Sequence, residues 1–278
     1  MPLLFERRAA LVAGIGSGQA IRIESLDFSF QVVKNLRREP NTAEIKIYNL
    51  APSSRESLEA AEEQRIRLET GYREDVHTIF EGDLRKASST REGPDIVTTI
   101  EGGDGERAFR QSRTNRSFGE GTSVRSVIED VAGGMGLGVG NLEAQTTGAG
   151  FEGLGSIYSE GTVVSGSSRE SLTGLCRSIG LEWSVQDGNL QLLPFRTALR
   201  QTAVLLSPQT GLVGSPSIDS ENVLEAKALI IPGIFPGRKV DVRAEFVTGV
   251  YRVTKATYQG STFGAEWYVT IQGRAVDG

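Results

Sequence analysis

Only two side chains in this sequence could act as the imidazole or the thiol of a catalytic or metal site. The 278 residues include one histidine, His77, and one cysteine, Cys176. Zinc fingers, His/Cys metal clusters and an internal disulfide all need more such residues, so the sequence excludes them. A Ser-His-Asp or Cys-His catalytic site would have to use His77.

Both residues have a simpler interpretation. His77 lies between two strand-like runs with no Gly-x-Ser-x-Gly motif nearby, which favours a histidine in a surface loop. Cys176 falls on the apolar stripe of a predicted helix, which favours a small buried hydrophobic residue. We therefore expect no catalytic residue, no metal ligand and no cofactor.

Acidic and glycine-rich clusters are the other candidates for chemistry. The densest acidic clusters are 81–83 and 101–106. Two carboxylates could serve a glycosidase, but solvated strand edges and turns carry such clusters more often. The glycine-rich stretches 14–18 and 134–140 lack the Gly-x-Gly-x-x-Gly spacing of a dinucleotide site, and no Gly-Lys-Ser/Thr motif is present.

Four arginines recur at three-residue spacing and are the candidate assembly residues. On a helix they would spread over a wide arc of one side, where they could meet phosphate or an acidic partner, although a solvated face is the commoner meaning. They precede an acidic segment, so a contact between the two is a testable expectation. The four residues are Arg107, Arg110, Arg113 and Arg116.

The charge is distributed unevenly along the chain. Residues 1–118 carry 18 cations and 19 anions, residues 119–198 carry 4 and 9, and residues 199–278 carry 8 and 7. The net charge of −5 therefore belongs to the middle segment, which also holds 16 of the 34 glycines. This shift in composition predicts a domain boundary on each side of residues 119–198.

The outer segments show the period-two alternation of half-buried strands. Between the strands of the first segment, Pro52 predicts a helix start, with Ser53 and Glu56 as a capping box. No run of about 18 apolar residues exists, so we expect no membrane insertion, and we expect the N-terminus to be flexible or to form a strand. The predicted strands are 26–32, 43–50, 66–69, 78–84, 96–100, 225–231, 239–243, 249–253 and 266–271.

The middle segment has helical periodicity instead. One helix is predicted over 124–135 behind Thr122 as N-cap, and a second one starts at a capping box of Ser167 and Glu170. A hairpin around Asp187-Gly188 follows, because this dipeptide favours a two-residue turn. The remaining stretch, 137–166, is predicted to be a long loop or irregular strands.

The two outer segments repeat one order of strands. We match 43–52 with 224–232, 65–70 with 239–244, 79–84 with 250–255 and 96–102 with 267–273. The prediction is a mainly β protein with an α+β insert: a barrel-like domain over 1–118, a helix-hairpin insert over 119–198 and a second, similar barrel-like domain over 199–278.

Several short motifs, taken in order, resemble a known family. They are Asn41–Pro52, Arg67–Tyr72, Ile79–Asp83, Thr210–Pro216, Ile231–Gly237 and Gly249–Val253 followed by Gly260. Together with the order of helices and hairpin in the middle segment, they resemble phage tail baseplate hub proteins of the late-control-protein-D-like type. That family is related to the hub portion of VgrG, the type VI secretion spike protein.

The resemblance implies a structural role without catalysis. It implies two tube domains per chain and a homotrimer, whose pseudo-sixfold ring would join the hexameric tail tube protein to the trimeric central spike protein. The insert would lie outside the ring and meet other baseplate proteins, while genome DNA would pass through the lumen without specific binding. The chain would be made in the cytoplasm of a bacterial host and located in the tail baseplate of a virion or of a contractile injection system.

Two other classes of function remain open from the sequence. A tail-associated cell-wall hydrolase is disfavoured by the single histidine, the lack of metal ligands and the lack of an appended catalytic domain. A β-sandwich carbohydrate-binding or adhesion module is disfavoured because two tryptophans and six tyrosines offer few rings for sugar stacking.

Overall fold

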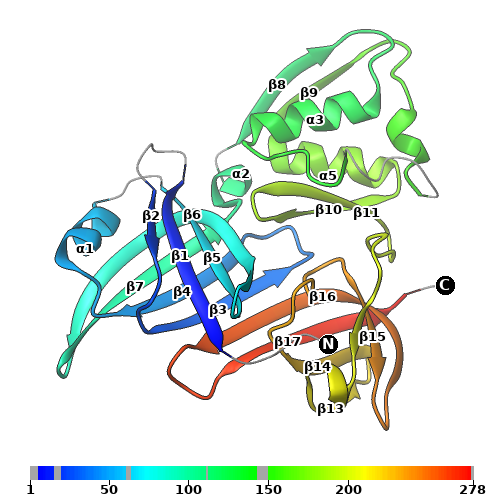
Figure 1. Cartoon of the computed structure of the whole chain (residues 1–278). Coiled ribbons are helices and arrows are strands. Elements are labelled where there is room, and N and C mark those ends of the chain that lie inside the picture. Colours follow the sequence, from blue (N-terminus) through cyan, green and yellow to red (C-terminus); the bar gives the residue numbers. More distant parts are fainter. Residues whose placement is uncertain (1–5, 16–19, 61–63, 111, 143–149, 277–278) are drawn as a thin grey trace.

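The chain is mainly β, as predicted, and its N-terminal strands form one half of a large sheet (Figure 1). The computed structural model describes residues 6–15, 20–60, 64–110, 112–142 and 150–276. The helix α1 (Pro52–Glu59) buries Leu58 in the core. The strands of this first unit are β1 (Arg7–Ile15), β2 (Ile21–Ile23), β3 (Phe28–Asn35), β4 (Asn41–Tyr48), β5 (Arg65–Tyr72), β6 (Asp75–Glu92) and β7 (Asp95–Asp104).

The C-terminal strands form the second unit of the same sheet. A 3-10 turn, η2 (Pro208–Thr210), lies between its first two strands, and β12 is parallel to β15. The strands are β12 (Val204–Leu206), β13 (Leu212–Ile218), β14 (Val223–Leu229), β15 (Lys239–Arg243), β16 (Thr248–Ser261) and β17 (Trp267–Ala275).

One antiparallel strand pair joins the two units. The C-terminal half of β16 runs beside β3, from the pair Lys255 and Asn35 to the pair Ser261 and Ser29. Side chains from both units, including Phe30 and Trp267, share a single hydrophobic core there. Within the described residues this gives one thirteen-stranded sheet in the order β13-β14-β17-β16-β3-β4-β7-β6-β5-β1-β2. Off this path, β15 pairs with β16 and β12 pairs with β15.

The prediction of two barrel-like domains is corrected by this sheet, which is not a closed barrel. The terminal strand β3 of the first unit pairs with β16 of the second unit and not with β2 at the other end of its own unit. The sheet therefore continues from one unit into the other where a barrel would have closed on itself.

The two units have the same strand order. The path β3-β4-β7-β6-β5 in the first unit corresponds to β13-β14-β17-β16-β15 in the second. The register agrees as well, because Ala43 lies opposite Gly102 and Leu224 lies opposite Gly273. Three of the four sequence matches agree with this register. The match of 79–84 with 250–255 is wrong by two residues, because Leu84 lies opposite Gly102 and Val253 lies opposite Gly273.

A shift of two residues leaves the alternation of a strand unchanged, so the pattern could not detect that error. A shared bulge strengthens the correspondence. The register of β6 on β7 shifts between Leu84 and Lys86, and the register of β16 on β17 shifts between Val253 and Lys255. Beside each bulge, a backbone N–H donates to the carbonyl of the residue that precedes the next strand of the unit. Leu84 donates to Gln64, before β5, at 2.7 Å, and Val253 donates to Arg238, before β15, at 2.9 Å. Bulges are specific features of a strand, so a shared bulge indicates a shared unit.

The insert between the units is built on a core of its own. Its apolar cluster includes Phe109 stacked on Trp183, with ring centroids 5.5 Å apart. Although β8 falls in the first predicted segment, it pairs with β9 of the middle segment. The elements are α2 (Glu106–Arg110), β8 (Arg113–Phe118), α3 (Val124–Gly134), η1 (Glu152–Gly155), β9 (Thr162–Ser167), α5 (Ser168–Ser178), β10 (Leu181–Gln186) and β11 (Asn189–Pro194).

The N-caps of the three longer helices agree with the sequence predictions only in part. Ser167 caps α5 as predicted, accepting from the backbone N–H of Glu170. The N-cap of α3 is Ser123 and not Thr122, whose hydroxyl donates to the carbonyl of Gly119. At α1 the predicted capping box is absent, because the N-cap is Ala51 and Ser53 is already inside the helix.

Candidate interface between the sheet and the hairpin

The hairpin β10–β11 of the insert contacts the sheet (Figure 1). Its turn is Asp187-Gly188, as predicted, and both residues have positive φ, at 55° and 77°. Such a turn matches the twist of a tight hairpin. It also leaves two consecutive N–H groups pointing toward the end of β7.

Asp104, the last residue of β7, accepts both of these N–H groups. Its Oδ2 lies 2.7 Å from the nitrogen of Asp187, and its Oδ1 lies 2.8 Å from the nitrogen of Gly188. Asp104 is fully buried. Burial and the nearby carboxylate of Asp187 raise the pKa of Asp104 to about 6, while Lys34, the Gly188 N–H and Asn41 act in the opposite direction.

Asn41 and Gln186 complete the buried part of the contact. The Asn41 Nδ2 donates to Asp104 Oδ2 at 3.1 Å and to the carbonyl of Val185 at 2.9 Å, while its Oδ1 accepts from the N–H of Asn35. The Gln186 Nε2 donates to the carbonyl of Asn35 at 2.8 Å. Together these buried polar groups fix the hairpin to β3, β4 and β7.

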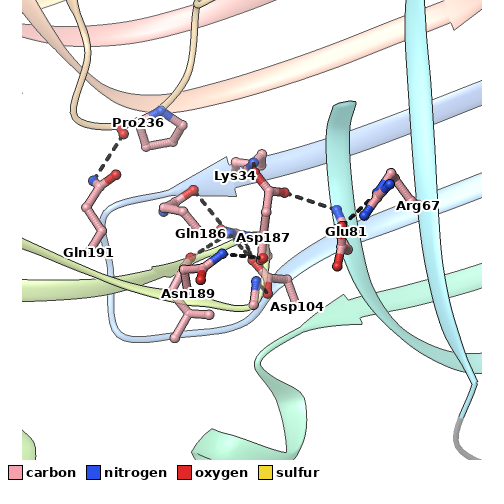
Figure 2. Close-up of polar contacts among 12 residues, drawn as sticks. Lys34, Arg67, Glu81, Asp104, Gln186, Asp187, Asn189, Gln191 and Pro236 are labelled. Atoms are coloured by element: carbon pink, nitrogen blue, oxygen red, sulfur yellow. Dashed lines mark hydrogen bonds and ion pairs between the residues drawn. The ribbon is translucent and has the colours of Figure 1, made fainter. Parts of the chain in front are cut away.

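The carboxylate of Asp187 connects the hairpin to a second set of strands. Figure 2 shows it between Lys34, whose Nζ lies 2.6 Å from Oδ2, and the backbone of Glu81, whose N–H donates to Oδ1 at 3.0 Å. Glu81 in turn accepts from Arg67 and pairs with Arg65. The side chain of Lys34 is almost fully buried, so loss of Asp187 would leave it without its ion-pair partner.

The second unit contacts the other side of the hairpin. Arg252 on β16 pairs with Glu182 on β10 and donates to the carbonyl of Thr197. Gln191 on β11 donates to the carbonyl of Pro236 at 3.2 Å (Figure 2). The hairpin is thus hydrogen-bonded to both units beside the β3–β16 junction, an arrangement suited to holding the insert in one orientation.

His77 and Cys176, the two side chains considered for catalysis, are not part of this network, although His77 lines the same cavity as Lys34 and Asp187. Cys176 is fully buried in α5, and burial raises the pKa of its thiol to about 12. His77 belongs to β6 and not to a loop, because the strand continues to a tight turn at Arg73, but it is exposed as predicted. Its Nε2 lies 2.7 Å from the exposed carboxylate of Asp75. Among the described residues no group of three or more His, Cys, Asp or Glu side chains could hold a metal ion.

The four arginines do not share a helix. α2 ends at Arg110, and Arg113 and Arg116 belong to β8, because the chain reverses there to pair with β9. Arg110 pairs with Glu106 of its own helix at 3.0 Å, and Arg116 lies 3.6 Å from Asp130 of α3. The side chain of Arg107 lies outside the described part of the chain.

Sequence reasoning missed the residues that do form the interface. Asp104 was grouped with a cluster of solvated carboxylates, whereas it is buried under the turn of a hairpin more than 80 residues away. The local pattern gave no signal, because the predicted strand ends at residue 100 whereas β7 continues to Asp104. Its partner could not be identified, because the pairing depends on the tertiary fold.

Comparison with known proteins identifies the kind of molecule that carries this fold. The profile of the family described as Baseplate hub gp41 matches residues 10–273. The chain belongs to the Baseplate hub gp41 family. No curated protein sequence matches it.

Solved structures of tail proteins share the fold of this hub protein at low sequence identity. The 43 kDa tail protein of prophage MuSo2 from Shewanella oneidensis is 12% identical, with a TM-score of 0.65 over 97% of this chain and 98% of that one. The tail protein from Neisseria meningitidis MC58 is 10% identical, with a TM-score of 0.63 over 97% and 96%.

A secretion-system protein has a similar fold. The E. coli c3393 protein is described as a component of the type VI secretion system with structural similarity to the T4 tail proteins gp27 and gp5. It is 11% identical to the hub protein, with a TM-score of 0.58 over 90% of this chain and 74% of that one. The resemblance to phage hub and spike-related proteins is thereby confirmed.

Family membership makes this chain a component of the phage tail baseplate. Within the described residues, no helix is long and apolar enough to cross a membrane.

Proposed function

We propose that this hub protein is a non-catalytic adaptor in which three chains form a ring with pseudo-sixfold symmetry. The observation that carries the proposal is the repeated unit. Each chain contains two sets of five strands with the same order, the same register and the same bulge. Two such units in each of three chains supply six similar surfaces, while the chains themselves keep threefold symmetry.

A molecule of this kind can join partners of different symmetry. One side of the ring would meet the hexameric tail tube protein through six similar surfaces. The other side would present three identical surfaces to the trimeric central spike protein. We place the domain boundaries where the cores change: a first unit up to Asp104, an insert from Glu106 to Pro194 held outside the ring, and a second unit from residue 199 onward.

The remaining parts of the proposal follow from this role. The insert is available to other baseplate proteins, with Arg110, Arg113 and Arg116 exposed on its surface. Genome DNA passes through the ring without specific binding, and the chain is made in the cytoplasm of the bacterial host before it joins the tail.

Native mass measurement of the purified full chain tests the proposal. We expect a species of three chains of 29.9 kDa each. A stable assembly of six chains would contradict it, because six copies of a two-unit chain would give twelve similar surfaces. Release of peptides or sugars from cell walls by the purified chain would contradict the non-catalytic role.

A further inference from the structure

Two strand edges of this chain are unpaired at corresponding places in the repeat. In the second unit, residues 255–261 of β16 pair with β17 on one side and with β3 on the other. The corresponding residues of β6, 86–92, pair with β7 on one side only. β13, which corresponds to β3, pairs with β14 on one side only, and no strand in the described part of the chain covers either free edge.

We propose that β13 of one copy pairs with residues 86–92 of β6 in a second copy, as β3 pairs with β16 inside one chain. This inference rests on the proposed ring and names the contact that closes it. Exposed strand edges present unsatisfied N–H and C=O groups and readily take up a further strand. The contact joins different surfaces of two copies, so its repetition produces a ring when the rotation closes.

The exposure of apolar side chains on β13 supports a second copy of the chain as its partner. Ile218 on β13 corresponds to Val32 on β3, because these residues lie opposite Leu224 and Ala43 in the matched registers. Val32 is fully buried under β16, whereas Ile218 is 46% exposed. Val213, on the same strand, is 39% exposed. A neighbouring strand would cover Ile218 as β16 covers Val32.

The edge of β6 over residues 86–92, which would accept β13, is also uncovered. Lys86-Ala87 follows the bulge of β6 as Lys255-Ala256 follows the bulge of β16. Ala256 is fully buried beside β3, while Ala87 is only partly buried. No residue of 86–92 is buried, although β6 continues as a regular strand on β7. A strand this long with one uncovered side is better explained by a partner than by the monomer.

The internal junction fixes the register of the proposed pair. Tyr258 lies opposite Val32, and Gln259 lies opposite Gln31. Transferring these pairs to the matched positions puts Ser89 opposite Ile218 and Thr90 opposite Ser217. The same register brings Lys86 toward the turn after β13, which carries Asp219 and Glu221, so the charges at that end are complementary.

Disulfide trapping tests the pairing and its register. The full chain carrying Ser89→Cys and Ile218→Cys is oxidised, and its mass is read on a gel without reductant. We expect covalent dimers and trimers, with nothing larger. The matched control is Ser88→Cys with Ile218→Cys, which we expect to stay monomeric on the gel because adjacent strand residues face opposite sides. Val33→Cys with Thr257→Cys, opposite each other inside one chain, is the intrachain control: loss of its free thiols without a change of mass shows that the oxidant works.

The outcomes separate this inference from the proposed function. A native trimer that gives no covalent product from the 89/218 pair overturns the strand pairing and leaves the trimer standing. Covalent products longer than three chains overturn the closed ring and leave the pairing standing. A monomer with no covalent product overturns both.

A second variant pair provides an independent measurement. Ile218→Asp puts a charge on the proposed edge and should convert the native trimer to monomer. Val163→Asp, at a residue of β9 in the insert that is 67% exposed, should leave the trimer intact. An Ile218→Asp chain that still assembles as a trimer would contradict the pairing.

Discussion

At the scale of single residues, the best-defined feature is the polar network under the hairpin turn. Its centre is a carboxylate without access to water, which accepts two backbone N–H groups and one amide. In the folded chain burial disfavours its charged form, so the pKa of Asp104 rises to about 6 from its ordinary value near 4. The folded state therefore binds a proton more readily than the unfolded state does.

The raised pKa of Asp104 makes the free energy of unfolding depend on pH. The stability contributed by this raised pKa is fully present below about pH 4 and is lost as the pH rises through 6. A shift of two pKa units corresponds to roughly 3 kcal/mol. We expect the free energy of unfolding of the wild type, minus that of Asp104→Asn, to be larger near pH 4.5 than near pH 7.5 by on the order of 2 kcal/mol.

Denaturant unfolding of both proteins at the two pH values measures this difference. Other titrating groups are common to the two chains and largely cancel. Equal differences at both pH values would show that Asp104 does not titrate in this range.

Asn41 gives a second test at this scale. Asn41→Ala leaves the buried N–H of Asn35 and the carbonyl of Val185 without their partner, so it should lower the free energy of unfolding by about 1–3 kcal/mol. Asn115→Ala, at an exposed position of β8, is the matched control and should change it by less than about 0.5 kcal/mol. Equal effects of the two substitutions would contradict the role given to the network.

At the scale of elements, the hairpin turn is both the most predictable feature and the most constrained one. Gly188 has a φ of 77°, and a Cβ there would lie 2.3 Å from the guanidinium of Arg65. Gly93, in the β6–β7 turn, has a φ of 63° with no atom within 4 Å of such a Cβ. A comparison of substitutions at the two glycines therefore separates the cost of the left-handed backbone from the cost of a steric contact.

Alanine substitutions at Gly93 and Gly188 measure these two costs as losses of stability. Gly93→Ala should cost roughly 1–2 kcal/mol of stability from the left-handed backbone alone. Gly188→Ala should cost more, because Arg65 must also move away from its contact with Glu81. Thermal unfolding of both variants checks the order, and an equal or smaller loss for Gly188→Ala would contradict it.

The elements also show how far sequence reasoning reaches. Asp187-Gly188 and the Ser167 cap were predictable because the interactions that favour them are local. The strand β6 was predicted to end at Leu84 and continues to Glu92, since its polar last third shows no apolar alternation. Alternation records burial, and in the isolated chain no residue of 86–92 is buried. The site at Asp104 was missed for a related reason, because its partners come from distant segments.

At the scale of the whole molecule, the charge and the fold divide the chain differently. The net charge of −5 lies within residues 119–198, while β8 and α2 add cationic residues of the preceding segment to the same body. The two β units carry the repeat, the shared core and the β3–β16 junction. We therefore assign the ring to the two units, and the partner contacts outside the ring to the insert.

The junction of the two units accounts for the fold and predicts the assembly. Sequence matching detected the repeat, including three of its four strand registers. It did not detect that the units share one sheet, because the β16–β3 pair lies between segments more than 200 residues apart. That pair is the template from which the contact between copies is inferred.

The most direct test of the central claim is an electron cryo-microscopy map of the hub in its assembled baseplate. We predict three chains whose six β units form one ring, with the first and second units alternating around it and the insert outside. A ring built from six chains, or three chains whose β units do not alternate in one ring, would contradict it.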